Sequence, residues 1–188
     1  MKKNLLAACL YTLVTALVLG IVYPLTITGI AHLTMRTKAN GQIIVRNGVA
    51  SGSALIGQPF TGRRYFHSRP SAAGAGYDGS ASSGSNYGPT NKALIDRVDV
   101  SNKAESMGTP VPVDLLTASG SGLDPDISPA AAFYQAGRIA EERHLPVRDV
   151  QRLVQDHVTP RQFGLLGEPR VNVLSLNMAL DQEPGSRH

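Results

Sequence analysis

The segment Arg63–Asn91, RRYFHSRPSAAGAGYDGSASSGSNYGPTN, gathers residue types that often carry chemistry: arginines, a histidine, serines and glycines. A Walker-type phosphate loop needs a lysine directly after its second glycine, but no lysine follows here until Lys92. A serine hydrolase elbow needs Gly-x-Ser-x-Gly, and the similar GSNYG has Asn86 at the nucleophile position. His67 beside Ser68 is not a triad, because neighbours in sequence rarely reach the required geometry. The segment therefore predicts no catalytic residue.

A metal site is not predicted either, because the histidines form no close pair at ligand spacing. They stand at His32, His67, His144, His157 and His188. Asp124 and Asp126 come just before a predicted helix, where negative charge stabilises the positive end of the helix dipole. That interpretation is favoured over acid–base catalysis.

The stretch RIAEERHLPVRDVQRLVQDH is similar to a DNA-binding helix-turn-helix in a basic chain. Two features oppose DNA binding. His144 stands where the turn usually has glycine, and Arg143 occupies a position that normally faces the core. Asp149 and Asp156 also mix acidic charge into the second helix. An αα-hairpin with a solvated outer face is the favoured interpretation.

The elements that must position these residues are strands first and helices later. Residues 42–46 and 49–55 form a predicted hairpin around Asn47-Gly48, a dipeptide that favours a type I′ turn. Residues 113–117 are predicted as a short strand. Helices are expected over residues 91–105, over 129–143 after the cap Ser128, and after Pro146.

The run 171–180 is compatible with a helix capped by Asn172 or with a strand, since periodicity cannot decide a segment this short. Together these elements predict an α+β fold. It comprises one N-terminal transmembrane helix and a single soluble domain with an early β-hairpin and a helical C-terminal part.

The N-terminus predicts a membrane anchor over residues 1–35. Leu5–Tyr23 is almost wholly apolar and would span ~28 Å as a helix, close to the hydrocarbon thickness of a bilayer. The alternative, a cleaved signal peptide, needs a shorter apolar core and a small-x-small cleavage site. Ala16 and Gly20 stand four apart on one face and would allow close helix packing. The short basic N-terminus favours a cytoplasmic location for this end.

Residues 36–188 are expected to form the soluble domain, with a Gly/Ser-rich loop over 71–91. The net charge of +4 is spread without long basic runs, which gives no indication of nucleic-acid binding. The single cysteine, Cys9, lies inside the predicted span, so the domain has no thiol that would restrict it to one redox compartment.

The chain resembles the C-subunit (KdpC) family of bacterial potassium-transporting P-type ATPases. The resemblance rests on the segments VYPL, GSALIGQPF, RYFHSRPS, SGSN, VPVDLLTASGSGLDPDISPAAAFYQ and LGEPRVNVLSLN, which occur in that order over nearly the whole chain.

The resemblance implies a non-catalytic accessory subunit of a high-affinity potassium uptake complex in the bacterial inner membrane. The implied partners are a potassium channel-like subunit, a P-type ATPase subunit and a small membrane subunit. ATP and potassium are handled by the complex, and no cofactor is expected on this chain. The family places the domain outside the cytoplasm over the ion entrance. An older idea has it assist ATP binding, for which Gln135 and Gln151 are weak candidates.

The segment of the opening paragraph is then expected to be a docking loop rather than a slack tether, because tyrosine and arginine dominate interface energetics. The candidate partner-binding residues are Tyr65, Phe66, His67, Arg69, Tyr77, Asn86 and Tyr87. Tyr65 and Phe66 could equally belong to the domain's own core. Arg69, Tyr77 and Asn86 could also order the loop. A secreted binding protein and a membrane-tethered DNA regulator remain as alternative function classes.

Overall fold

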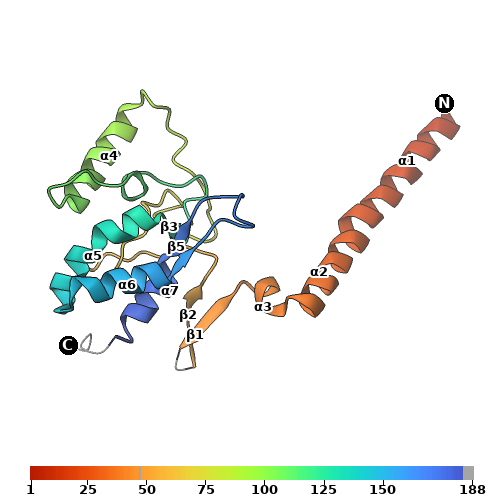
Figure 1. The fold of residues 1–188 in the computed structure, drawn as a ribbon. Helices are drawn as coiled ribbons and strands as arrows, with labels where there is room; N and C mark the ends of the chain where they lie inside the picture. The colour runs from red at the N-terminus through yellow and green to blue at the C-terminus, as the bar shows by residue number, and fades with distance from the viewer. Residues whose placement is uncertain (47, 184–188) are drawn as a thin grey trace. The chain divides into compact units, whose positions relative to one another are not determined.

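The computed structural model describes residues 1–46 and 48–183 (Figure 1). The chain forms two compact units, Met1–Ser51 and Gly52–His188. Each unit has its own architecture, and the second one contains the hydrophobic core.

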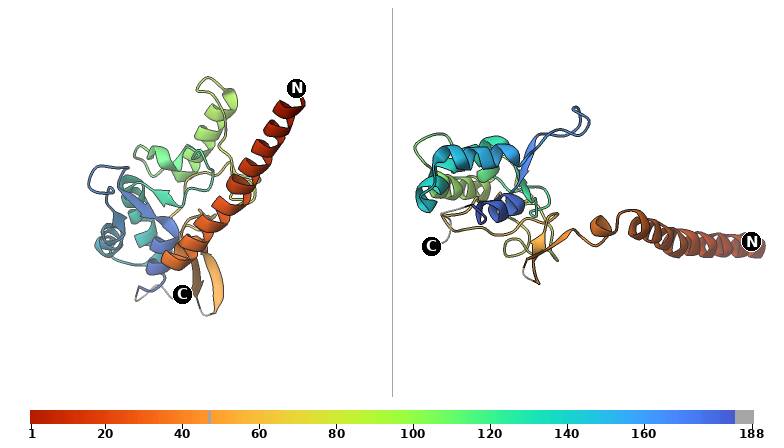
Figure 2. Two further views of the ribbon diagram at one scale, coloured as in Figure 1. Left: turned by 90° about the vertical axis from the view of Figure 1, so that its right-hand side faces the viewer. Right: turned by 60° about the horizontal axis from the view of Figure 1, so that its bottom comes forward.

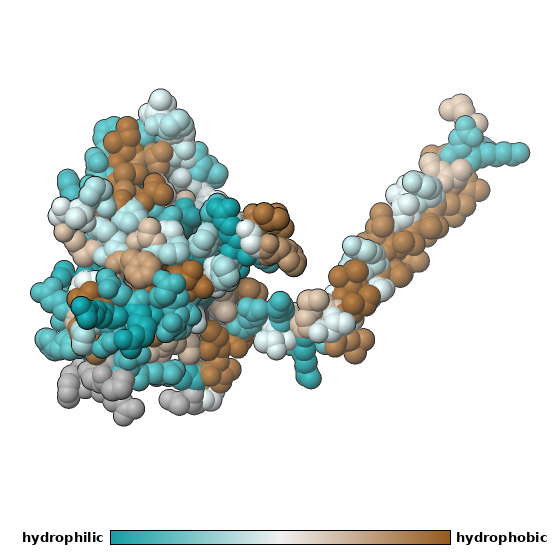
Figure 3. All heavy atoms as spheres, viewed as in Figure 1, coloured by the Kyte–Doolittle hydropathy of each residue, from teal (hydrophilic) through white to brown (hydrophobic). Residues whose placement is uncertain are grey.

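The first unit is dominated by one long apolar helix. It comprises α1 (Lys2–Leu17), the π-helical turn η1 (Val18–Val22) and α2 (Tyr23–Thr34). Together these form a run of 33 residues, and no residue of its most apolar part is buried. By length and composition it can cross a membrane, and Figure 3 shows its almost continuous apolar surface. Pro24 accounts for the π turn, because proline cannot donate to the carbonyl four residues earlier and its ring crowds that carbonyl.

A short helix, α3 (Arg36–Ala39), follows, and β1 (Ile43–Arg46) pairs with β2 (Val49–Ser53) in a two-stranded sheet. The predicted early hairpin is therefore confirmed. The predicted type I′ turn includes Asn47, which lies outside the described residues, while Gly48 has the left-handed φ of 79°.

The predicted helices of the second unit are confirmed, and side-chain caps begin three of them. Asn91 accepts from the Ala93 N–H at α4 (Lys92–Glu105), and Ser128 accepts from the Ala131 N–H at α5 (Pro129–Arg143). α6 (Val147–Asp156) follows Pro146 after a tight turn in which His144 adopts the left-handed conformation. α7 (Val173–Leu180) begins at Asn172, which accepts from the Ser175 N–H.

Three short strands also lie among these helices: β3 (Asp126–Ile127), β4 (Val158–Thr159) and β5 (Arg170–Asn172). They form an antiparallel sheet in the order β3-β5-β4. The run 171–180 is thus a strand at its start and a helix from Val173 onward. The fold is α+β, as predicted, but strands are not confined to its first part.

Two expectations were wrong. Residues 113–117 do not form a strand, because local i→i+3 hydrogen bonds after Pro112 close a 3₁₀-helix, η2 (Val113–Leu115). Arg143 does lie inward: its side chain is only 2% exposed, so its position does not speak against a helix-turn-helix. α6 buries Val150 and Val154 against the core and keeps an outer face of mixed charge exposed, which includes Arg148, Arg152 and Asp156.

The core consists mainly of aliphatic side chains from α5, α6, α7 and β5. Its buried hydrophobic residues are Phe66, Leu115, Ile127, Ala131, Ala132, Ala136, Ile139, Ala140, Val150, Val154, Val171, Val173, Leu176 and Leu180. α4 contributes no buried residue. Figures 1 and 2 show α5, α6 and α7 gathered around the small sheet.

The Gly/Ser-rich loop is fixed on the segment that precedes β3. The Ser71 hydroxyl donates to the Gly122 carbonyl at 2.6 Å, and the Ser83 N–H donates to the Ser121 carbonyl at 2.9 Å. Gly122 has a φ of +66°, and a Cβ placed there would lie 2.4 Å from the Ser83 carbonyl oxygen. Only glycine therefore permits this close approach of the two chains.

Replacing Gly122 with alanine should lower the free energy of unfolding by roughly 2–5 kcal/mol, because both the left-handed backbone and the close contact oppose a methyl group. Gly120→Ala is the matched control, since a Cβ there meets nothing within 4 Å. Urea denaturation of both variants measures the difference. Equal stability of the two would show that the loop does not pack here.

Candidate functional site

The segment Arg63–Arg69, here called the clamped segment, crosses α5 and α7 without joining a sheet. Its backbone polar groups therefore need partners other than strand neighbours. Side chains of the two helices supply them. This segment contains four of the candidate partner-binding residues, Tyr65, Phe66, His67 and Arg69.

Two buried amides hold the middle of the clamped segment. Asn177 of α7 accepts from the Phe66 N–H at 2.8 Å and donates to the Phe66 carbonyl at 3.0 Å. Gln135 of α5 accepts from the His67 N–H at 2.7 Å and donates to the His67 carbonyl at 3.3 Å. Each amide thus pairs with both polar groups of one residue, as a neighbouring strand would.

Two arginines of α5 hold its beginning. Arg138 donates to the carbonyls of Arg63 and Tyr65, and Arg143 donates to the carbonyl of Arg64 at 2.7 Å. Arg143 also pairs with Asp181 at 2.9 Å, and its guanidinium lies 4.8 Å from the centre of the Tyr65 ring. Burial lowers the pKa of Arg138 from its ordinary value, because the charged form loses contact with water. Both guanidinium groups are therefore structural.

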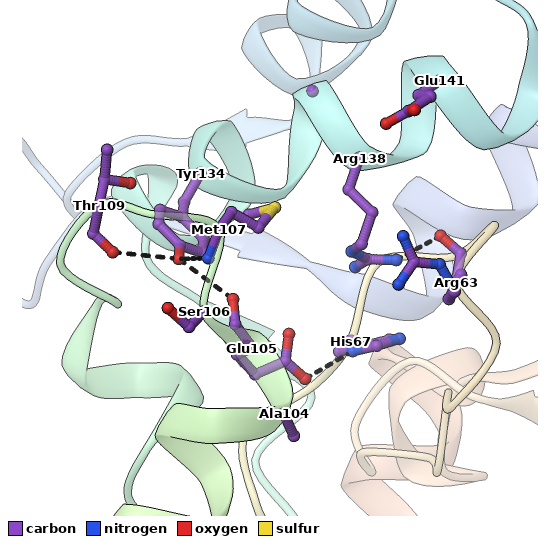
Figure 4. Close-up of a pocket in the computed structure, with 11 residues that line it drawn as sticks. Arg63, His67, Ala104, Glu105, Ser106, Met107, Thr109, Tyr134, Arg138 and Glu141 are labelled. Atoms are coloured by element: carbon purple, nitrogen blue, oxygen red, sulfur yellow. Dashed lines mark hydrogen bonds and ion pairs between the residues drawn. The ribbon is translucent and has the colours of Figure 1, made fainter.

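A cavity of about 470 Å³ opens beside the clamped segment (Figure 4). The His67 Nδ1 faces the Glu105 carboxylate of α4 at 2.7 Å, and the His67 Nε2 lies 3.2 Å from the Gly62 carbonyl. The Tyr134 hydroxyl donates to the Glu105 carbonyl at 3.1 Å and accepts from the Met107 N–H at 3.0 Å. The residues that line the cavity are Arg63, His67, Ala104, Glu105, Ser106, Met107, Thr109, Tyr134, Gly137, Arg138 and Glu141.

His67 has a structural role in this cavity. Both ring nitrogens of His67 already face an oxygen, so neither is directed at a nucleophile. In the part of the chain that the structure describes, no group of histidine, cysteine, aspartate and glutamate side chains is arranged to hold a metal ion. The arrangement pins the end of α4 to the clamped segment.

The candidate residues of the clamped segment have different surroundings. Phe66 is fully buried in the core, so its ring packs the domain and is not offered to a partner. Tyr65 is partly buried and lies 5.9 Å from Phe60 between ring centres. Arg69 pairs with Asp124 at 3.2 Å. Of the two interpretations left open for Tyr65 and Phe66, the core position holds for Phe66.

The two tyrosines of the Gly/Ser-rich loop differ in the same way. The Tyr77 hydroxyl donates to the Arg69 carbonyl, and the Tyr77 N–H donates to the Ser71 hydroxyl at 2.8 Å. Burial raises the pKa of Tyr77, so its phenol remains a donor. Tyr77 therefore orders the loop. Asn86, with a left-handed φ of 54°, and Tyr87, 44% exposed, lie on the surface.

The remaining candidates divide between interior and surface. Gln135 is fully buried by the contacts described above, whereas Gln151 of α6 is exposed. Ala16 and Gly20 are exposed on the apolar helix, and a Cβ at Gly20 would meet nothing within 4 Å of this chain.

Sequence reasoning missed the residues that hold the site. Asn177, Arg138 and Glu105 received no role, although Asn177 and Arg138 are buried polar residues. A polar side chain at a core-facing position of a helix is the signal that could have identified Asn177 and Arg138.

These features define a small α+β domain joined to one apolar helix, with a fixed surface loop and a site that clamps backbone instead of holding a reactive group. The sequence profile described as "K+-transporting ATPase, c chain" matches residues 5–182. The chain therefore belongs to the KdpC family and is a subunit type of the potassium-transporting ATPase complex.

Curated relatives agree over nearly the full length. The potassium-transporting ATPase KdpC subunit of Acidobacterium capsulatum is 60% identical over 181 residues, which cover 96% of this chain and 98% of the relative. That of Koribacter versatilis is 58% identical over 184 residues, covering 96% and 95%. That of Mycobacterium tuberculosis is 50% identical over 188 residues, covering 97% and 100%. This assignment decides against the secreted binding protein and the DNA regulator.

Replacing Gln135 with leucine should lower the free energy of unfolding by about 2–4 kcal/mol, because the buried N–H and carbonyl of His67 lose their partner. Gln151→Leu, at an exposed position of α6, should change stability little. Thermal or urea unfolding of the full chain in detergent measures both. A Gln135→Leu variant of normal stability would contradict the clamp.

Proposed function

We propose that this chain is a non-catalytic accessory subunit that stabilises the assembly of the channel-like and ATPase subunits and shapes ion access from outside the cytoplasm. In this role the apolar helix remains in the inner membrane with its N-terminus in the cytoplasm. The domain then docks on the outer face of its partners, and ATP hydrolysis belongs to another subunit.

The observation that carries this proposal is the fixed shape of the Gly/Ser-rich loop. A slack tether of this composition would be a flexible coil. Here Ser71, Ser83 and Tyr77 tie the loop to the domain, and Arg97 of α4 donates to the Ser71 carbonyl. Because its entropy is already lost within the domain, the loop can dock without a further ordering cost.

Assistance to ATP binding has less support. Both polar atoms of the Gln135 side chain already form hydrogen bonds inside the domain, and the residue is 0% exposed. Gln151 is exposed, but a single amide on a charged helix face is no nucleotide site. A domain outside the cytoplasm would also be separated from ATP by the membrane.

The role of the membrane helix is to hold the domain near its partners. Apolar helices gain little hydrophobic stabilisation from one another in lipid, so close packing at small residues must supply the contact. Ala16 and Gly20 offer such a surface. Once anchored, the domain is held near its partners at high effective concentration, which strengthens even a modest docking contact.

Replacing Tyr87 with alanine should weaken co-purification of the full chain with the other subunits by roughly 5–30-fold, the loss expected for an exposed tyrosine at an interface. The melting temperature should change little, because Tyr87 is not part of the hydrophobic core. Tyr77→Phe is the matched control for a loop-ordering role: it should lower stability by removing the hydroxyl bond to Arg69. Unaltered assembly by the Tyr87→Ala chain would argue against docking through this loop.

Replacing Gly20 with leucine should release the subunit from the complex in detergent, since the added side chain blocks close helix approach. Gly29→Leu makes the same change nine residues further on. At about 3.6 residues per turn that position lies on another face, and neither glycine has a neighbour within 4 Å in this chain. Affinity purification through a partner subunit, followed by quantification of this chain, distinguishes the two. Retention of both variants would contradict packing at Gly20.

A further inference from the structure

The loop that connects β4 and β5 carries three large apolar side chains at its turn. These residues, here called the apolar tip, are Phe163, Leu165 and Leu166. Their exposed fractions are 92%, 80% and 59%. Figures 1 and 2 show the connection extending away from the helices of the domain, and Figure 3 shows apolar surface at its end. A cluster of this kind is costly in water and marks an interaction site.

The apolar tip has a fixed shape. The Gln162 N–H donates to the Leu166 carbonyl at 2.9 Å, and the Leu166 N–H donates back to the Gln162 carbonyl at 2.9 Å. The Gly164 N–H donates to the Arg161 carbonyl and the Leu165 N–H to the Gln162 carbonyl, each at 3.1 Å, so these N–H groups of the turn have partners within it. The turn can therefore enter an apolar environment without leaving these groups unpaired.

The backbone of Phe163 is strained. Its φ is 54°, in the left-handed region that large side chains seldom adopt, and the next residue, Gly164, has a φ of 74°. Packing within this domain does not offset the backbone strain, because the Phe163 ring contacts so little of the domain. Strain of this kind, kept at an exposed site, indicates that the position of the ring matters for a contact elsewhere.

A hollow lies at the base of the same hairpin and reaches the residues discussed for docking. It measures about 510 Å³ and is lined by Arg69, Asp114, Asp124, Asp126, Ile127, Ser128, Gly167, Glu168, Pro169 and Arg170. Three of its carboxylates pair with guanidinium groups: Asp124 with Arg69, Asp126 with Arg170 and Glu168 with Arg161. Arg69 links the hollow to the end of the clamped segment.

We propose that the apolar tip inserts into an apolar pocket on a partner subunit of the same potassium-transporting complex. The inference rests on the accessory role proposed above and adds a second docking element to the Gly/Ser-rich loop. Protein interfaces commonly place an apolar anchor at the centre and polar or charged side chains around it. The ion pairs at the base of the hairpin supply such a surrounding here.

Charge argues against lipid as the occupant. Loops that enter a bilayer use free basic groups to bind phosphate headgroups. At the neck of this hairpin Arg161 pairs with Glu168 at 2.5 Å, and Arg170 pairs with Asp126 at 3.0 Å. Neither of these guanidinium groups is therefore free to bind a headgroup phosphate.

The first experiment compares Phe163→Ser with Val113→Ser in the full chain, co-expressed with the other subunits. Phe163→Ser should reduce co-purification about tenfold or more without lowering the melting temperature, because the ring is 92% exposed. Val113, 65% exposed in η2, is the control and should retain assembly. Normal assembly by Phe163→Ser overturns the proposal.

The second experiment identifies the occupant. In a Cys9→Ser background, Leu166→Cys carries a polarity-sensitive fluorophore, and the full chain is placed in vesicles of phosphatidylethanolamine and phosphatidylglycerol. A blue shift that occurs only after assembly with the other subunits supports the protein pocket. A shift in the vesicles alone assigns the apolar tip to lipid and overturns the proposal, as does the absence of any shift in the complex.

The two docking proposals can be refuted independently of each other. If Tyr87→Ala disrupts assembly while Phe163→Ser does not, the accessory role stands and the apolar tip has no part in it. If neither variant disrupts assembly, the docking role itself is refuted.

Discussion

The domain depends on two buried carboxamides that take the place of a missing strand. The backbone of Phe66 and His67 crosses the core, where an unpaired N–H or carbonyl costs roughly 1–3 kcal/mol. Asn177 and Gln135 pair with all four groups. Since one amide belongs to α7 and the other to α5, the clamped segment can bind only when both helices are in place. The helices, the core and the route of the chain are thereby coupled.

This coupling gives the polar side chains around the clamped segment structural partners. Arg138 and Arg143 donate hydrogen bonds to backbone carbonyls, and His67 contacts the Glu105 carboxylate of α4. A buried polar network that is fully satisfied specifies one geometry, whereas a catalytic group must keep an unsatisfied face for its substrate. The domain therefore presents two surface features, the Gly/Ser-rich loop and the apolar tip.

Local signals in the sequence predicted the elements well. Asn91, Ser128 and Asn172 each cap the helix that follows them, because capping uses only neighbouring residues. The segment at Val113 was predicted as a strand, since nothing local distinguishes a β-rich triplet from a 3₁₀ turn. The long apolar helix, the hairpin and the α+β class followed from composition and periodicity.

The roles of individual site residues could not be predicted in the same way, because their partners are distant in sequence. Phe66 and Asn177 are 111 positions apart, and Arg143 and Asp181 are 38 apart. Whether a tyrosine orders a loop or faces a partner depends on such contacts: Tyr77 reaches the Arg69 carbonyl, while Tyr87 remains exposed. The apolar tip escaped notice because its pattern resembles a core segment.

A rigid domain changes what its anchor must do. An apolar helix among other apolar helices has little hydrophobic preference for one neighbour, so it supplies proximity more than selectivity. Selectivity then has to come from features whose spacing is fixed. Arg69 connects the end of the clamped segment with the hollow below the apolar tip. Under the proposed docking, a partner that fits one feature would also meet the other, and the second contact would form without further loss of translational freedom. Two modest contacts on one stiff body can in this way hold a subunit that neither would hold alone.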